Sequence, residues 1–252
     1  MESMRLRKWA LGVVTLLVAN GCASGGPNLY QLGPDALYER GVQEFEAERW
    51  NDAIRAFEQI VQRHPMDPRI EEVRFLIGTA YFEKKDYVTA AAEFVRVATD
   101  YPRGEYAEEA RFKTCEAYFE LSPRPQLDQE YTQAAIEHCG ALLDSYPTGE
   151  YAERTRELVD DLHGKLAEKV FLNGEYYLKR RWYDSAIIYF EDVITRYPSS
   201  RFTPRAMLRL VEVYGALGYG DEMESVRSRL EREYPDSEEA RLAGEITLVN
   251  GR

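Results

Sequence analysis

The sequence contains few of the residues that build metal and redox centres. Its 252 residues include three cysteines and three histidines, and no two cysteines have the C-x-x-C spacing of zinc ribbons and thiol–disulfide oxidoreductases. The H-E-x-x-H spacing of zinc proteases and the glycine-rich phosphate-binding loop are both absent. No part of the sequence places a nucleophile, a base and an orienting group together. We therefore expect no metal, no cofactor, no small-molecule substrate and no enzymatic activity.

Basic residues are also scarce. The chain has 32 Lys and Arg residues against 44 Asp and Glu residues, so its formal net charge is −12. A nucleic-acid-binding protein needs a basic surface that displaces counterions from phosphates. We therefore expect no nucleic-acid partner. Because anionic headgroups would also repel this chain, attachment to a membrane would need something other than surface charge.

The longest apolar run is too short to cross a bilayer. It covers residues 9–19 and follows the basic residues Arg5, Arg7 and Lys8, whereas a membrane-spanning helix needs ~20 residues. A basic flank, a short apolar run and small residues after it are typical of a secretory signal peptide. We predict this signal peptide over residues 1–21.

A cysteine follows the predicted signal peptide directly. Ala19-Asn20-Gly21-Cys22 is similar to the lipobox of bacterial lipoproteins, although Ala19 and Asn20 stand where Leu and a small residue are usual. We predict lipidation of Cys22, with plain secretion as the alternative. Residues 22–33 contain Gly and Ser and are predicted to be a flexible tether.

Recurring prolines divide the rest of the chain into five apolar segments that each end in His-Pro or Tyr-Pro. Proline ends helices because it lacks the amide hydrogen and disfavours helix in the preceding residue. In three segments a Gly is followed at offsets of 12, 16, 19 and 24 residues by Ala, Phe, an aliphatic residue and Pro: Gly41, Ala53, Phe57, Ile60 and Pro65; Gly78, Ala90, Phe94, Val97 and Pro102; Gly174, Ala186, Phe190, Val193 and Pro198. Cys115, Ala135 and Cys139 take the Gly, Ala and Phe positions in the third segment, and Val211 takes the Gly position in the fifth.

This spacing resembles the tetratricopeptide repeat, in which two antiparallel helices cross closely at the Gly and Ala positions. We predict an all-α, right-handed α-solenoid of about five repeats within a domain over residues 34–250. The repeats cover about 34–67, 71–104, 108–149, 167–200 and 204–237. The sequence also predicts a proline-containing loop over 121–129, a long helix over 151–179 and a final capping helix over 237–249.

Residues 165–199, and the motif Tyr-Pro-x-Gly-Glu-Tyr-Ala at 101–107 and again at 146–152, resemble the ComL family of outer-membrane assembly lipoproteins. The resemblance extends from Pro34 to about Pro235. It implies a non-catalytic scaffold of the β-barrel assembly machinery, anchored by lipid to the outer membrane and facing the periplasm. It also implies three kinds of protein partner: the barrel-forming subunit with its periplasmic domains, other assembly lipoproteins, and unfolded outer-membrane proteins. The alternative is another repeat lipoprotein, such as a secretin pilotin or a cell-wall coordinator.

Aromatic residues recur at two positions on the first helix of the first three repeats. The upstream position, three residues before the Gly position, is Tyr38, Phe75 or Phe112, and the downstream position, four residues after it, is Phe45, Phe82 or Phe119. Such a stripe could line a groove that accepts apolar side chains of an extended peptide. The candidate peptide-binding residues are Tyr38, Phe45, Phe75, Thr79, Phe82 and Phe112. Plain core packing is the other interpretation, and we expect the upstream position to be the more exposed of the two.

Two further features have alternative interpretations. Lys179, Arg180, Arg181 and Trp182 form a basic cluster at the turn of the fourth repeat, which is either a docking patch for an acidic partner or a solvated turn. Cys115 and Cys139 lie on facing helices, and an oxidising periplasm permits a disulfide between them. Because their positions are about one turn out of register, the sequence favours two buried free thiols.

Overall fold

The computed structural model describes residues 28–248, where all regular secondary structure is helical. A 3-10 helix, η1 (Leu29–Gln31), precedes eleven α-helices in this range: α1 (Pro34–Glu46), α2 (Trp50–Arg63), α3 (Ile70–Glu83), α4 (Tyr87–Asp100), α5 (Ala107–Leu121), α6 (Glu130–Ser145), α7 (Ala152–Lys179), α8 (Tyr183–Arg196), α9 (Thr203–Leu217), α10 (Gly220–Glu233) and α11 (Glu238–Glu245). The predicted signal peptide, Cys22 and residues 249–250 of the predicted domain lie outside the described residues. Among the described helices, none combines the length and the apolar character needed to cross a bilayer.

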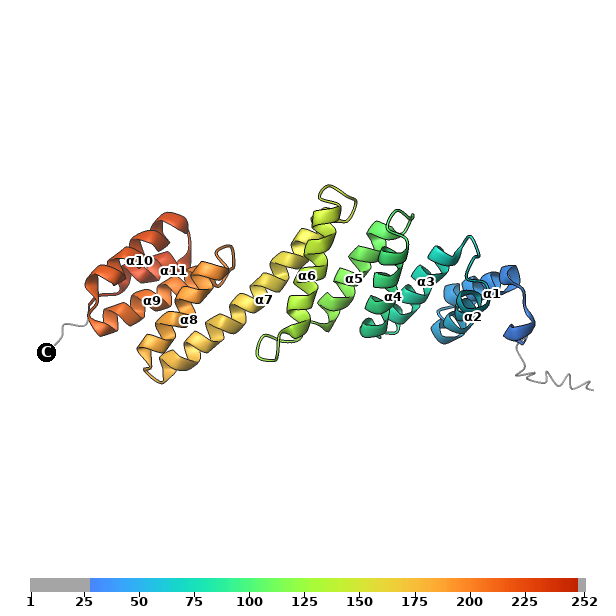
Figure 1. Cartoon of the computed structure of the whole chain (residues 1–252). Helices are drawn as coiled ribbons and strands as arrows, with labels where there is room; N and C mark the ends of the chain where they lie inside the picture. The colour runs from blue at the N-terminus through green and yellow to red at the C-terminus, as the bar shows by residue number, and fades with distance from the viewer. Residues whose placement is uncertain (1–27, 249–252) are drawn as a thin grey trace, which may run out of the picture.

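The helices form an elongated row of antiparallel pairs (Figure 1). From α1 to α10, each helix packs mainly against the helices next to it in sequence, whereas α11 packs mainly against α9. The buried apolar residues of the described range form four successive clusters. This confirms the predicted all-α solenoid, in which each repeat contacts only its neighbours. The long helix predicted over 151–179 is present as α7, which links the third repeat to the fourth (Figure 1).

Each regular repeat is closed where a glycine on its first helix faces a phenylalanine ring on its second. A Cβ atom at Gly174 would lie only 2.6 Å from the nearest ring atom of Phe190, and the same distance is 2.3 Å in the first repeat and 2.8 Å in the second. The three rings are fully buried and cannot move into solvent. No side chain fits at these glycines, which explains the recurring Gly and Phe positions.

The third repeat replaces this contact by a covalent bond. Cys115 and Cys139 occupy the Gly and Phe positions and form a disulfide with Cα atoms 4.9 Å apart. The prediction of two free thiols is therefore wrong. The extra residues of this repeat lie in the loop 122–129 between α5 and α6, so the two helices keep the register in which the Gly and Phe positions meet.

The recurring Tyr-Pro-x-Gly-Glu-Tyr-Ala motif forms the joint between repeats. The backbone amide of Tyr106 donates to Glu71 of the preceding repeat over 2.8 Å, and that of Tyr151 donates to Glu108 over 3.3 Å. The glycine two residues before each tyrosine leaves room for the carboxylate, since a Cβ atom at either one would lie within about 2 Å of it. Contacts between neighbouring repeats of this chain therefore account for the tyrosine and glycine of the motif.

Candidate protein-binding surfaces

The upstream aromatic position does not line an open groove in the second and third repeats. Phe75 exposes 7% and Phe112 exposes 5% of its surface. The ring of Tyr106 stacks on Phe75 with centroids 4.8 Å apart, and the ring of Tyr151 stacks on Phe112 with centroids 4.6 Å apart. The expectation that this position is the more exposed one is therefore wrong for both residues, because each ring is covered by the joint with the next repeat.

Tyr38, at the same position in the first repeat, is half-buried and takes part in a polar joint. Its hydroxyl donates to Glu72 over 2.7 Å, and the guanidinium of Arg69 lies 4.6 Å from the centre of its ring. Burial and this hydrogen bond raise the pKa of Tyr38 to about 12. Arg69 stands where the next repeat has Tyr106, so the first joint uses a cation where the second uses an aromatic ring.

The downstream position leaves part of each ring accessible. Phe45 packs edge-on against Trp50, with centroids 5.0 Å apart, and Phe82 packs in the same way against Tyr87 at 5.1 Å. Both phenylalanines are half-buried. Thr79 is half-buried too, and its hydroxyl donates to the Phe75 carbonyl of its own helix over 3.0 Å. Of the six candidate peptide-binding residues, Phe45 and Phe82 therefore keep part of their aromatic surface accessible, with the ammonium of Lys113 in the next repeat 5.2 Å from the Phe82 ring centre.

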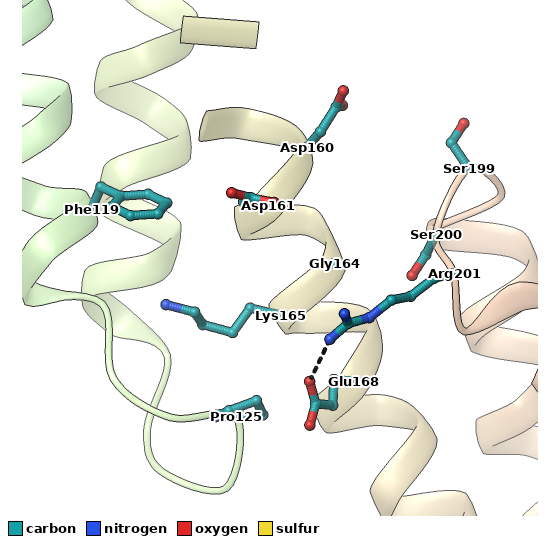
Figure 2. Close-up of a pocket in the computed structure, with 10 residues that line it drawn as sticks. All are labelled: Phe119, Pro125, Asp160, Asp161, Gly164, Lys165, Glu168, Ser199, Ser200 and Arg201. Atoms are coloured by element: carbon teal, nitrogen blue, oxygen red, sulfur yellow. Dashed lines mark ion pairs between the residues drawn. The ribbon is translucent and has the colours of Figure 1, made fainter. Parts of the chain in front are cut away.

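A hollow of about 430 Å³ surrounds the middle of α7, between the third and fourth repeats (Figure 2). Its floor is Gly164, where a Cβ atom would meet nothing within 4 Å. On one side the ammonium of Lys165 donates to the Ser122 hydroxyl over 2.7 Å and lies 5.5 Å from the Phe119 ring centre. On the other side Arg201 reaches back to Glu168 at 3.5 Å, as Figure 2 shows.

No motif in the sequence predicts this hollow. Its walls come from α5, the loop 122–129, α7 and the turn after α8, which are far apart in sequence and meet only in the folded chain. Burial lowers the pKa of Lys165, and its hydrogen bonds anchor the 122–129 loop to α7. The only local signal was Gly164, an open helical glycine with no packing role in the repeat motif.

The basic cluster lies entirely on the surface, at the turn between α7 and α8. Lys179, Arg180, Arg181 and Trp182 are all exposed, and Trp182 exposes 55% of its surface. The guanidinium of Arg180 lies 3.5 Å from the ring centre of the exposed Tyr176. The ion pairs formed among the described residues include Arg209 with Glu175, on the last turns of α7, but none of the three cations of the cluster. We call this cluster, together with Tyr176, the basic–aromatic turn.

Comparison with known proteins places the chain among outer-membrane lipoproteins. Residues 31–240 match the family model YfiO, described as outer membrane lipoprotein. A relative from Caulobacter vibrioides, named outer membrane protein assembly factor BamD, is 29% identical over 84% of this chain and 72% of its own length. A relative of the same name from Rickettsia prowazekii is 26% identical over 93% of this chain and 94% of its own length.

Among solved structures, the chain is similar to the TPR2AB domain of yeast Sti1 in its pHSP90 complex. The identity is 16% and the TM-score 0.43, over 83% of this chain and 80% of that one. The family model covers residues 31–240, or 210 of the 252 residues, and so includes every α-helix but the end of α11. This confirms the resemblance seen in the repeat motifs: the chain belongs to the YfiO family of outer membrane lipoproteins.

Proposed function

We propose that this protein is a non-catalytic scaffold of outer-membrane β-barrel assembly, bound to the barrel-forming subunit and to other assembly lipoproteins. The observation that carries the proposal is the shared name of its relatives, both outer membrane protein assembly factors. A row of helix pairs with a continuous surface suits the binding of other polypeptides. Lipid chains on Cys22 would hold the acidic protein at the periplasmic face of the outer membrane.

The basic–aromatic turn is the proposed docking surface for an acidic region of the barrel-forming subunit. Three cations without a carboxylate partner among the described residues stand beside two exposed aromatic rings in a chain of net charge −12. Exposed aromatic and arginine side chains supply much of the binding energy at protein interfaces. Cations that are not neutralised within the chain can complement negative charge on a partner.

Reversing two charges of this turn tests the docking surface. We expect Arg180→Glu/Arg181→Glu to lower recovery of the barrel-forming subunit from detergent-solubilised outer membranes by about tenfold, or ~1.4 kcal/mol, because attraction becomes repulsion. The matched control is Lys84→Glu/Lys85→Glu, which makes the same change at the same turn position of the second repeat. Equal losses in both variants would contradict a specific surface, and recovery of a secretin would favour the pilotin alternative.

We also propose that the downstream aromatic stripe binds extended apolar segments of unfolded outer-membrane proteins. We expect Phe45→Leu/Phe82→Leu to weaken binding of a labelled peptide from a C-terminal barrel strand by about threefold to tenfold, because an aromatic contact contributes ~0.5–1.5 kcal/mol beyond its buried area. Fluorescence anisotropy measures the affinity. Val88→Ala, at an exposed apolar residue of α4, is the control and should change nothing. Unchanged peptide affinity in the double variant would exclude this role.

A further inference from the structure

The fifth repeat lacks the side chains that close the turn in the first two repeats. Counted from the Gly position, Gly215 stands where the first repeat has Phe45, and Gly220 stands where it has Trp50. Arg227 likewise stands where the first repeat has the buried Phe57. Two aromatic rings are thus replaced by glycines and the central ring by a guanidinium. Met223 of α10 fills part of the space at Gly215, where its sulfur would lie 3.2 Å from a Cβ atom, and the repeat's own helices leave the rest unfilled.

The C-terminal strap, residues 246–248, fills that space. A helix was predicted up to residue 249, but α11 ends at Glu245 and the backbone continues in an extended conformation at Ile246. A Cβ atom on Gly215 would lie 3.3 Å from Cγ2 of Ile246, and one on Gly220 would lie 3.3 Å from Cδ1 of Leu248. The helix prediction is wrong here because these two aliphatic side chains, two residues apart, occupy the places of the missing aromatic pair.

Arg227 binds the backbone of the strap. Its Nη2 donates to the carbonyl oxygen of Ile246 over 2.5 Å, while its Nη1 lies 3.1 Å from Glu224. Only 16% of the Arg227 side chain is exposed. A contact to a main-chain carbonyl does not depend on the identity of the ligand's side chains. The arginine therefore fixes the register of an extended chain, while the two glycines select aliphatic side chains at alternate positions.

The strap is held much more lightly than the helices that receive it. Its hydrogen bond to Arg227 is made at Ile246, whereas Thr247 is exposed and Leu248 exposes 42% of its surface. By contrast, α9 belongs to the largest apolar cluster of the described chain, together with Met223 and Leu230 of α10. This cluster consists mainly of helical residues, and Ile246 of the strap packs at its edge. We therefore expect the helices to stay folded when the strap leaves.

We infer that the turn of the fifth repeat is a binding site for an extended aliphatic peptide, which this chain occupies with its own strap. A partner segment with aliphatic side chains two residues apart displaces the strap and binds in the same register. The strap is the observed occupant of the site and shows which ligand chemistry fits it. This site is distinct from the basic–aromatic turn and from the aromatic stripe.

The experiment uses the full chain and a fluorescein-labelled peptide, Gly-Glu-Ile-Thr-Leu-Val-Asn, that copies residues 244–250. We expect the variant Ile246→Ser/Leu248→Ser to bind this peptide at least tenfold more tightly than the unchanged chain, whose strap competes for the site. A peptide with Ser in place of Ile and Leu is the control ligand and should not bind. Adding Arg227→Met to the variant should reduce the affinity about tenfold, because the main-chain carbonyl loses its donor.

Two outcomes would overturn the inference. One is a folded double variant, with unchanged circular dichroism, that does not bind the peptide, which would make the strap a fixed cap. The other is equal binding by the variant and the unchanged chain, which would place the peptide elsewhere. If the double variant does not fold, Leu248→Ser alone leaves Ile246 in place against the core. That variant should still bind the peptide at least threefold more tightly than the unchanged chain, and no gain would equally reject the site.

Discussion

Reducing the disulfide between Cys115 and Cys139 is expected to lower the free energy of unfolding of the third repeat by roughly 3–4 kcal/mol. The bond closes a loop with a sequence separation of 24 residues, and releasing a loop of that length restores about this much chain entropy to the unfolded state. No buried ring compensates for the loss, because the third repeat has a cysteine at the position where Phe57, Phe94 and Phe190 fill the others.

Urea unfolding with and without a reducing agent measures this effect, and hydrogen exchange locates it. Because repeats couple mainly to their neighbours, we expect faster exchange in α5 and α6, with little change in α1 and α2. The variant Cys115→Ala/Cys139→Ala is the control and should not respond to the reducing agent. A midpoint that stays unchanged after intact mass confirms full reduction would show that the bond adds nothing to stability.

Adding one methyl group at Gly174 is expected to destabilise the fourth repeat by about 1 kcal/mol net. The new Cβ atom of Gly174→Ala would lie 2.6 Å from the ring of Phe190, which is fully buried and packs against Phe171 with centroids 5.5 Å apart. The ring cannot move aside, and inserting carbon into a packed core costs ~1–3 kcal/mol. This cost exceeds the ~0.5–1 kcal/mol that alanine gains over glycine inside a helix.

Gly164→Ala is the matched control, since it makes the same substitution in the same helix. A Cβ atom there meets nothing within 4 Å, so only the helix gain remains and we expect stabilisation by ~0.5–1 kcal/mol. Chemical denaturation measures the change in the free energy of unfolding, which should be negative for Gly174→Ala and positive for Gly164→Ala. If both substitutions stabilise the chain, the proposed close contact between Gly174 and Phe190 does not limit packing.

Sequence alone predicted the helical repeats because their signals are local and recur. Proline at the end of each helix pair, and the fixed offsets from Gly41 to Ala53 and Phe57, reflect one close crossing of two helices that each repeat must build for itself. The same locality predicted α7 from a long run without proline. The run of charged residues at 179–181 likewise predicted that this turn lies on the surface, because burying three unpaired cations is unfavourable.

Features that depend on contacts between repeats could not be predicted in this way. Phe75 and Phe112 looked like groove residues, yet Tyr106 and Tyr151 of the following repeats cover them. The hollow around α7 exists only because the 122–129 loop and the turn at Arg201 meet that helix from opposite sides (Figure 2). The apolar pattern of α3 and α5 is compatible with either a buried or an exposed aromatic ring. Helical periodicity predicts the face of the helix on which a side chain lies, but it does not predict which neighbouring segment covers that face.

The sequence by itself determined the helix pairs, their order and the close Gly–Phe crossings, because each of these is decided within about 34 residues of chain. Only the tertiary structure decided which aromatic rings stay accessible, that Cys115 and Cys139 are joined, and that Ile246 and Leu248 fill the space over Gly215 and Gly220. The disulfide depends on the exact approach of two adjacent helices, which the sequence pattern places side by side without giving the distance between their sulfur atoms. The accessible rings and the place of the strap depend on how segments from different helix pairs pack together.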